Sequence, residues 1–282
     1  MGLKHSVAKL LEVTGITSVF FYMSKLVYGA HIRVINYHGT PQQNATNFEA
    51  QLEFYKRHYV SVSQKELDLF FTGKWESQKP GLIISFDDGY RNNYDVALPL
   101  LEKHGFIGWF FIPSGMIDGS NAEQAVFAGR NKDKLAQAYP DGRYLMTWDE
   151  LKKITEKHVI GCHTFSHHRM NKKDEEEILE KEIVYSKQLL EQKLQQPVDV
   201  FCWVGGEEYT YTQAAAAKIK QTGYRYSFMT NTYPVRKNAN PLQLQRSNIE
   251  SDNSLSLVRF QLNSLMDILY YSKRKRVNKT TA

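Results

Sequence analysis

The sequence predicts an α/β protein whose strands form one parallel sheet or barrel. Short apolar runs rich in β-branched residues alternate with helical segments about seven times along the chain. No internal sequence repeat accompanies this alternation. Several of the apolar runs end directly in charged or glycine-containing motifs, which is typical of parallel sheets because their strand ends carry the functional residues.

The first elements are helical. Residues 3–29 predict one or two amphipathic helices with Gly15 as a break, and the pattern changes at residue 30. Up to residue 112 we expect strands at 31–37, 59–63, 82–86 and 106–112, and helices at 48–58, 64–72 and 93–104, the last two ending at Gly73 and Gly105.

The second half of the chain continues the alternation after a long excursion at 115–145, which we expect to be partly helical and to shape a site. Thr147 and Glu150 form a capping box that starts a helix. Further on we expect strands at 159–162, 198–203 and 224–230, and helices at 174–195, capped by Asp174, and at 212–222.

Length and composition limit the possible classes. The chain has 282 residues, of which 42% are hydrophobic and 13% aromatic, enough for a sizeable core and against disorder. The formal net charge of +6 raises nucleic acid, an anionic membrane surface and an acidic substrate as partners. The sequence contains no recognisable nucleic-acid-binding motif, so we expect no nucleic-acid partner.

The positive charge is concentrated at one end. Residues 270–282 contain five basic residues and no acid, so residues 1–269 carry about +1. We therefore divide the chain into an N-terminal helical extension at 1–29, a main α/β domain at 30–269 and a basic tail at 270–282. The tail is expected to be a solvated end. Together with the aromatic segment Phe20 to Tyr22, it also supports the hypothesis of peripheral attachment to anionic lipid.

The apolar runs and the two cysteines of the sequence predict its compartment and the redox state of its thiols. No apolar run is long enough for a transmembrane helix, and no cleavable signal peptide is evident. We expect a cytoplasmic protein, peripheral at the inner membrane as a second hypothesis, with a cell-envelope or periplasmic location left open. Cys162 and Cys202 are expected to be free thiols.

The motifs at the ends of two predicted strands indicate chemistry. Asp87-Asp88-Gly89 follows the apolar run 82–86, and the sequence from His163 to His167 follows 159–162. Asp-Asp-Gly alone is most often a turn, and two histidines four residues apart are most often a surface or core pair. Together, one carboxylate and two imidazoles suit a divalent ion with open positions, and the second carboxylate can act as a base. His168 is interpreted as a bystander.

At this point the sequence resembles the polysaccharide deacetylase family, also called the NodB-homology domain or carbohydrate esterase family 4, over about residues 30–250. Residues 84–90 are similar to its Thr-Phe-Asp-Asp-Gly motif, and residues 163–167 to its His-[Ser/Thr]-x-x-His motif. The resemblance implies a distorted (β/α)7-type barrel, here with an N-terminal helical extension. It also implies Zn²⁺, or another divalent ion such as Co²⁺ or Ni²⁺, on Asp88, His163 and His167, with Asp87 as general base.

The sequence departs from the family pattern in two places. No histidine follows His168, whereas the family usually supplies a late general-acid histidine. Asn36-Tyr37-His38 is similar to the rearranged order of poly-N-acetylglucosamine deacetylases, which implies His38 as the acid. The third motif, residues 201–206, lacks the usual arginine, and we expect Arg246 to replace it as the partner of Asp87.

Substrate contacts are predicted at three further places. Trp203 is expected to form an apolar wall for the acetyl methyl group or the sugar ring, and Tyr90 to contact the substrate. A backbone N–H of Tyr90 or Arg91 is expected to hold the oxyanion.

The expected function is removal of acetyl groups from N-acetylated sugars of a bacterial surface polysaccharide, lipopolysaccharide or lipid-linked precursor. Three alternatives stay open: a deacetylase or amidase of the same fold acting on an O-acetyl ester or a non-sugar amide, a catalytically degenerate glycan-binding protein, and a nucleic-acid binder suggested by charge alone.

Overall fold

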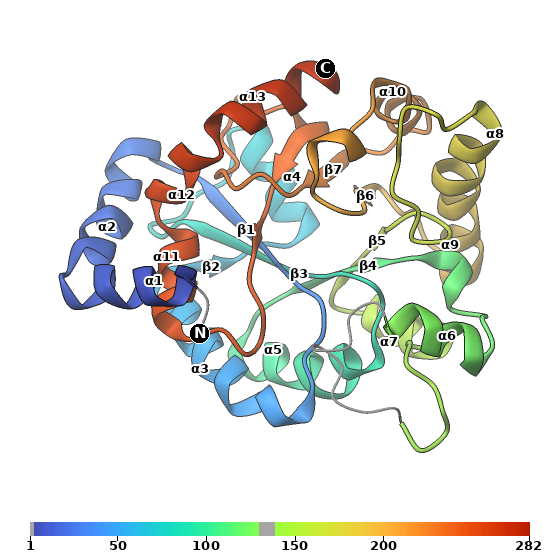
Figure 1. Cartoon of the computed structure of the whole chain (residues 1–282), viewed down its shortest axis with the longest axis horizontal. Helices are drawn as coiled ribbons and strands as arrows, with labels where there is room; N and C mark the ends of the chain where they lie inside the picture. Colours follow the sequence, from blue (N-terminus) through green and yellow to red (C-terminus); the bar gives the residue numbers. More distant parts are fainter. Residues whose placement is uncertain (1–2, 130–138) are drawn as a thin grey trace.

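A computed structural model of the chain describes residues 3–129 and 139–282, and within them one sheet of parallel-paired strands (Figure 1). The strands are β1 (Ile32–Tyr37), β2 (Val60–Ser61), β3 (Gly81–Phe86), β4 (Gly108–Ile112), β5 (Val159–Cys162), β6 (Val200–Cys202), β7 (Tyr226–Met229), β8 (Leu244–Gln245) and β9 (Ser247–Asn248). Each strand predicted from the sequence is present, within a few residues of its expected bounds.

The sheet is nearly closed as a barrel. Its order is β8-β7-β6-β5-β4-β3-β1-β9, with β2 paired to β3. Only Arg246 separates β8 from β9 in the chain. One short extended segment therefore pairs with β7 on one side and with β1 on the other, and joins the two edges of the sheet. This confirms the predicted (β/α) barrel class.

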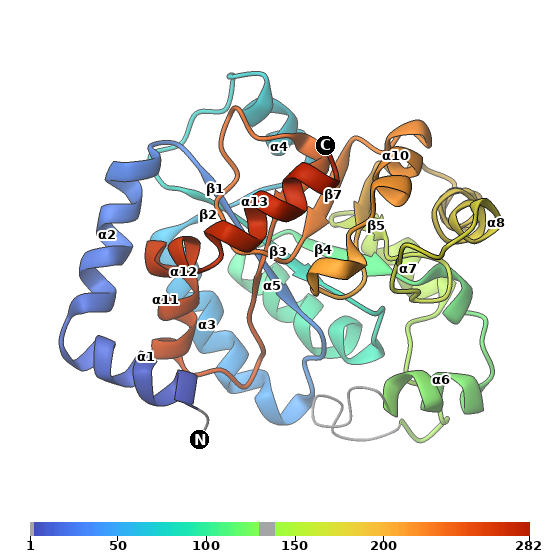
Figure 2. The same ribbon diagram turned by 45° about the horizontal axis from the view of Figure 1, so that its top comes forward.

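Helices surround the barrel in both views (Figures 1 and 2). The α-helices are α1 (Leu3–Val13), α2 (Ile16–Tyr28), α3 (Ala45–His58), α4 (Gln64–Phe71), α5 (Leu98–His104), α6 (Asn121–Ala128), α7 (Trp148–Ile154), α8 (Glu176–Leu179), α9 (Ser186–Leu194), α10 (Gln213–Gln221), α11 (Leu255–Leu262), α12 (Ser264–Leu269) and α13 (Tyr271–Thr280). The π-helical turns Asn93–Ala97 and Glu180–Tyr185 lead into α5 and α9, and short 3₁₀ turns lie at Gln42–Asn44, Ser114–Met116, Glu208–Thr210 and Pro241–Gln243. None of the described helices combines the length and the apolar character needed to span a bilayer.

The strands are buried on both faces because their side chains alternate between two cores. Phe110 and Ile112 of β4 belong to the large core beneath the surrounding helices. Trp109 and Phe111 belong to a second core, built from strand residues together with side chains of α4 and its flanking segments, that fills the barrel. Continuous apolar strands are therefore explained by burial on both sides.

Local signals define most helix ends as predicted. Thr147 and Glu150 form both bonds of the capping box at α7. Gly105 ends α5 in the left-handed conformation, with φ +75°. The prediction for Asp174 is wrong: Glu175 precedes the helix, and Asp174 instead accepts hydrogen bonds from the Asn171 backbone and side chain and pairs with His168.

The segment 270–282 is not the solvated end expected from its composition. It forms α13, in which Arg274 and Val277 are buried. Arg274 donates to the carbonyl oxygens of Asn231, Thr232 and Asp267, and its guanidinium lies 4.1 Å from the centre of the Tyr233 ring. Buried carbonyl groups that need donors thus bind a helix whose sequence is strongly polar.

The excursion at 115–145 is partly helical, as expected, since it contains α6. Residues 130–138 of it lie outside the described part of the chain. The remainder returns to the barrel through an antiparallel bridge between Tyr90 and Leu145.

Candidate active site

A polar cavity of about 410 Å³ lies where the carboxyl ends of several strands meet. This volume is within the range of small-ligand sites, roughly 300–1,000 Å³. The cavity is lined by Asn36, His38, Asp87, Asp88, His163, His167, Arg169, Gly205, Gly206, Glu207, Thr230, Asn248, Tyr270 and Lys273. The two motifs predicted from the sequence therefore meet in one cavity, together with His38.

The register of the parallel strands places these side chains at the same end of the sheet. Tyr37 of β1 pairs with Phe86 of β3, so His38 and Asp87 each follow directly on adjacent strands. The His163 N–H donates to the carbonyl oxygen of Ile112 at the end of β4. Parallel strands in register place the residues that follow them at one edge, as the sequence analysis assumed.

Asp88, His163 and His167 converge as a set of metal ligands would. His167 Nε2 lies 2.9 Å from Asp88 Oδ1, and His163 Nε2 lies 3.6 Å from the same oxygen. The three candidate ligand atoms all lie within 4.8 Å of one another. Two imidazoles and one carboxylate are a donor set for Zn²⁺ with open positions, so these residues fit a divalent ion.

Protonation states agree with this fit. Burial lowers the pKa of His163 to about 4, so its imidazole is neutral, as a ligand must be. Burial alone would raise the pKa of Asp88, but the histidines around it outweigh that effect and hold the pKa below its usual value. The carboxylate is therefore ionised.

The backbone around the ligands adopts conformations that cost energy. Asp88 has φ +73° and His167 has φ +58°, in the left-handed region that residues with a Cβ rarely occupy. Gly89 continues the turn at φ +68°, with side-chain atoms of Ile112 and Ile117 only 3.5–3.6 Å from where a Cβ would lie. The tight turn directs Asp87 and Asp88 to different partners.

Glu182 holds the loop between the two histidines. Its carboxylate accepts hydrogen bonds from the backbone N–H groups of Phe165 and Ser166 and from the Ser166 hydroxyl, at 2.7–3.0 Å. His168 turns the other way and pairs with Asp174 at 3.0 Å. The interpretation of His168 as a bystander is consistent with this geometry.

Asp87 pairs with Arg246 inside the barrel. Arg246 Nη1 and Nη2 donate to the two carboxylate oxygens at 2.7 and 2.9 Å, and both residues are almost completely buried. Burial alone would raise the pKa of Asp87, but Arg246 and His163 outweigh burial and hold that pKa below its usual value. The expected contact between Arg246 and Asp87 is thus confirmed.

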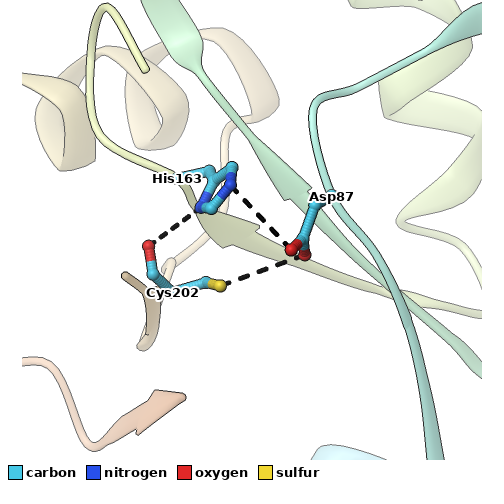
Figure 3. Close-up of side chains that lie close together, drawn as sticks. All are labelled: Asp87, His163 and Cys202. Carbon is cyan, nitrogen blue, oxygen red and sulfur yellow. Dashed lines mark hydrogen bonds and ion pairs between the residues drawn. The ribbon is translucent and has the colours of Figure 1, made fainter. Parts of the chain in front are cut away.

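A second cluster of possible ligands, Asp87, His163 and Cys202, shares His163 with the first (Figure 3). His163 Nδ1 lies 2.9 Å from the carbonyl oxygen of Cys202, which leaves Nε2 facing the carboxylates. Burial raises the pKa of the Cys202 thiol well above its usual value, which disfavours the thiolate that binds metal, and Arg246 already donates to both Asp87 oxygens. The first cluster is therefore the better candidate for a metal site.

The assignment predicts that Cys202→Ala leaves metal binding unchanged. The Cys202 carbonyl that orients His163 is retained in the variant, and only a neutral thiol is lost. Elemental analysis of the purified variant should give the same ion content per chain as the wild type. A loss of the ion on removal of the thiol would show that the second cluster holds it.

His38 lies at the cavity with its own carboxylate partner. Its Nδ1 lies 2.9 Å from Glu250 Oε1, and the residue lines the cavity. Burial alone would lower the pKa of His38, but the hydrogen bond to Glu250 and the nearby carboxylates outweigh it, so the pKa is raised. Asn93 donates to the His38 carbonyl oxygen at 2.7 Å and fixes the chain there.

The structure places the side chains of Trp203 and Tyr90, both predicted to contact the substrate, outside the cavity. Trp203 is 1% exposed and donates through Nε1 to Ser227 beneath the surrounding helices. Because side chains alternate along a strand and Cys202 points into the barrel, Trp203 points outward, and it does not line the cavity.

Tyr90 and the Arg91 amide are also outside the cavity. Tyr90 is fully buried under α6, with its ring centre 5.9 Å from that of Phe127, because the turn at Gly89 carries the chain away from the site. The Arg91 N–H donates to the Tyr144 carbonyl oxygen. Arg91 therefore cannot supply the oxyanion donor that was expected from its backbone.

Sequence reasoning missed several cavity residues. Asn36 lies two residues before His38 on the same face of β1, a signal that strand alternation could have given. Tyr270 and Lys273, which line the cavity, and Glu250, which contacts His38, come from the C-terminal quarter of the chain. Only long-range packing brings them to the cavity.

The sequence matches a known protein family and several curated proteins. A sequence profile of the family described as "Polysaccharide deacetylase" matches residues 74–227. Putative polysaccharide deacetylase YxkH of Bacillus subtilis is 24% identical over 208 residues, covering 71% of this chain and 65% of that protein. A poly-beta-1,6-N-acetyl-D-glucosamine N-deacetylase of Staphylococcus aureus is 23% identical over 216 residues, covering 76% of this chain and 70% of that protein. The chain thus spans about two thirds of the length of these curated relatives.

Solved structures share the fold. The Streptococcus pyogenes deacetylase PplD in complex with acetate superposes with a TM-score of 0.65 at 17% identity, covering 83% of this chain and 99% of that one. IcaB from Ammonifex degensii gives a TM-score of 0.60 at 16% identity, covering 83% and 97%. At these identities the likeness concerns the barrel fold.

Proposed function

Because the chain belongs to the polysaccharide deacetylase family, we propose that it is a metal-dependent hydrolase that removes acetyl groups from N-acetylated sugars. The substrate we propose is a bacterial surface polysaccharide, lipopolysaccharide or lipid-linked precursor. The observation that carries the proposal is the single cavity that contains Asp88, His163 and His167 beside the Asp87–Arg246 pair and His38. The relative named as a poly-beta-1,6-N-acetyl-D-glucosamine N-deacetylase supports an N-acetylated sugar polymer.

In this proposal Asp88, His163 and His167 hold the ion. A divalent ion there would polarise the acetyl carbonyl and make water a stronger acid. The chain orients its ligands by the hydrogen bond between His163 and the Cys202 carbonyl and by the Glu182 bonds to the loop before His167. Zn²⁺ fits these donors best, and Co²⁺ or Ni²⁺ would serve as substitutes.

Asp87 takes the proton from the attacking water. Its Oδ2 lies 4.0 Å from His163 Nε2, on the side of the proposed ion. A carboxylate oxygen has two acceptor positions, so Oδ2 can accept from Arg246 and still receive a proton. Arg246 holds the carboxylate in one orientation and keeps it ionised.

His38 gives a proton to the leaving amine, which departs poorly unless it is protonated. Its Nδ1 is held by Glu250, so Nε2 carries the transferred proton. The raised pKa of His38 favours the protonated form that an acid requires.

This role predicts a dependence on the leaving group. His38→Gln should lower kcat on an N-acetylated sugar by about 10²–10⁴-fold. The same variant should retain most of its activity on a nitrophenyl acetate ester, because a nitrophenolate leaves without protonation. An equal loss of kcat on both substrates would show that His38 is not the general acid. Metal content and thermal unfolding of the variant serve as controls.

The proposed function is tested by measuring acetate release across a substrate panel. The panel contains N-acetylglucosamine oligomers, lipid-linked N-acetylated saccharides, O-acetylated glycans and non-sugar acetamides. We expect turnover of N-acetylated sugars that is lost on exhaustive chelation and restored by Zn²⁺ or Co²⁺. Release only from O-acetyl esters or non-sugar amides would favour the alternative substrates, and ion and glycan binding without any turnover would identify a glycan-binding protein.

A further inference from the structure

The outer face of α2 is apolar and uncovered. Its large side chains Ile16, Val19, Met23, Leu26 and Val27 are between 39% and 86% exposed. They recur at intervals of three and four residues and therefore form one stripe along the helix. Such a stripe normally faces a core rather than solvent.

The inner face of α2 is the one that packs on the protein. Phe21 packs against α3: its ring centre lies 5.1 Å from that of His58 and 5.9 Å from that of Phe54. Tyr28 donates to Asp267 of α12, at 2.9 Å. Phe21, at the centre of the aromatic segment proposed from the sequence for lipid contact, thus faces inward, and the side chain of Tyr22 is not among those described. The exposed stripe is a separate feature.

The apolar surface extends onto neighbouring helices. Leu10 and Val13 of α1 are exposed, as are Ile268, Leu269 and Tyr271 at the junction of α12 and α13. An open cavity of about 620 Å³ lies between Tyr28, at the end of α2, and residues of this junction. In the described part of the chain, ten of the fifteen exposed large apolar side chains belong to this surface, which we name the α2 surface.

The positive charge of the protein is concentrated on the same helices. Residues 1–29 contain three lysines and one glutamate, and residues 270–282 contain five basic residues and no acid. The other residues, 30–269, therefore carry a formal charge of −1, although the whole chain has +6.

The two acidic residues of these helices, Glu12 and Asp267, are each paired with an arginine and therefore would not repel an anionic partner. Glu12 pairs with Arg259, and Asp267 is buried in a bidentate bond with Arg33. Lys9 and Lys275 are exposed, and Lys275 lines the cavity at the α12–α13 junction. The other basic residues of α13 point elsewhere: Lys273 reaches the active-site cavity, Arg274 is buried, Arg276 pairs with Glu208, and Lys279 lies beside α10.

We infer that the α2 surface docks on a bilayer that contains anionic phospholipid, with its apolar stripe in the headgroup region and its lysines at the lipid phosphates. Combined apolar and cationic surface is what interfacial helices use to bind such membranes. A second copy of this chain is a poorer occupant, because it would bring the exposed lysines of the two copies together with no exposed acid of these helices to pair with them. The inference does not depend on the proposed chemistry.

Docking would bring the active-site cavity close to the membrane. Tyr270 and Lys273 line that cavity, and the exposed residues Leu269 and Tyr271 flank Tyr270 in the chain. Figures 1 and 2 show α1 and α2 at one side of the molecule, outside α11 and α12. The geometry suits a substrate carried at a lipid surface.

Vesicle co-sedimentation of the full chain tests the inference, using phosphatidylcholine alone and phosphatidylcholine mixed with phosphatidylglycerol. We expect binding to the mixed vesicles that weakens with added salt. The Leu26→Glu/Val27→Glu double variant should lower that binding by about tenfold or more, because two charges replace the most exposed part of the stripe. Leu269→Glu is an independent variant of the same surface.

Val126→Glu is the matched control. Val126 is 70% exposed on α6, at the opposite side of the molecule from α2 in both views (Figures 1 and 2). This variant should bind vesicles like the wild type, and all variants should keep wild-type thermal unfolding.

Two outcomes would overturn the inference. One is equal vesicle binding by the α2 and α6 variants. The other is a wild-type chain that ignores both kinds of vesicle but forms dimers in sedimentation, with the α2 variant monomeric, which would identify the surface as an interface between copies.

Discussion

Replacing His167 by Ala should abolish ion binding and lower deacetylation by about 10³-fold or more, equivalent to about 4 kcal/mol of transition-state stabilisation. His167 Nε2 is 2.9 Å from Asp88 Oδ1 and is one of three ligand atoms in the cluster. Two remaining ligands cannot retain the ion at ordinary concentrations. Elemental analysis and acetate release from an N-acetylated oligosaccharide measure the two losses.

The adjacent histidine provides the control for this prediction. His168 is bonded to Asp174 and does not line the cavity. His168→Ala should therefore keep its ion and most of its activity. Comparable losses in the two variants would mean that the loop, and not the ligand set, is being disturbed.

Arg246→Met should destabilise the protein by about 3–5 kcal/mol, because it leaves the Asp87 carboxylate buried without its partner. Guanidinium denaturation measures the change in the free energy of unfolding. Adding Asp87→Asn should recover much of the stability, because a neutral amide replaces the uncompensated charge. The double variant should remain inactive, since it lacks the base.

A second buried pair distinguishes stability from chemistry. Arg33 binds Asp267 through two hydrogen bonds of 2.7 Å, and neither residue lines the active-site cavity. Arg33→Met should also destabilise the protein, but it should leave acetate release per folded molecule near the wild-type value. If Arg246→Met behaved in the same way, Arg246 would be a structural residue only.

Local sequence signals predicted that the three candidate metal ligands lie together, and they do line one cavity. Asp88, His163 and His167 each lie within a few residues of a buried strand, and parallel pairing brings such residues to one edge. The motif spacing contains that information. The proposed general base Asp87 is likewise adjacent to Asp88.

Side-chain direction was harder to predict. Trp203 follows β6 directly, as the histidines follow β5, yet it points to the outer core because Cys202 points into the barrel. Alternation predicts that the two must differ, but it does not say which of them faces inward. A buried strand is apolar on both faces, so its sequence does not reveal its orientation.

The polar composition of the C-terminal segment wrongly predicted a solvated end, whereas the segment forms a packed helix. Residues 270–282 are polar and basic, but Arg274 satisfies buried carbonyl groups and Lys273 reaches the active-site cavity, where it donates to Gly206. These partners lie about forty residues or more away in the chain. A charged residue gives no sign in the sequence of which distant acceptor it will meet.

The sequence by itself determined the alternation and order of strands and helices and the metal-ligand and base candidates, because periodicity and short motifs are local properties. The alternation left a parallel sheet or a barrel open, and the resemblance to the deacetylase family added the barrel. Only the tertiary structure decided that the segment 244–248 joins both edges of the sheet and places Arg246 on Asp87, that Glu250 holds His38, and that α13 completes the cavity wall. These contacts join residues that are distant in the chain, and they form because burial in the closed barrel requires each charge to find a partner.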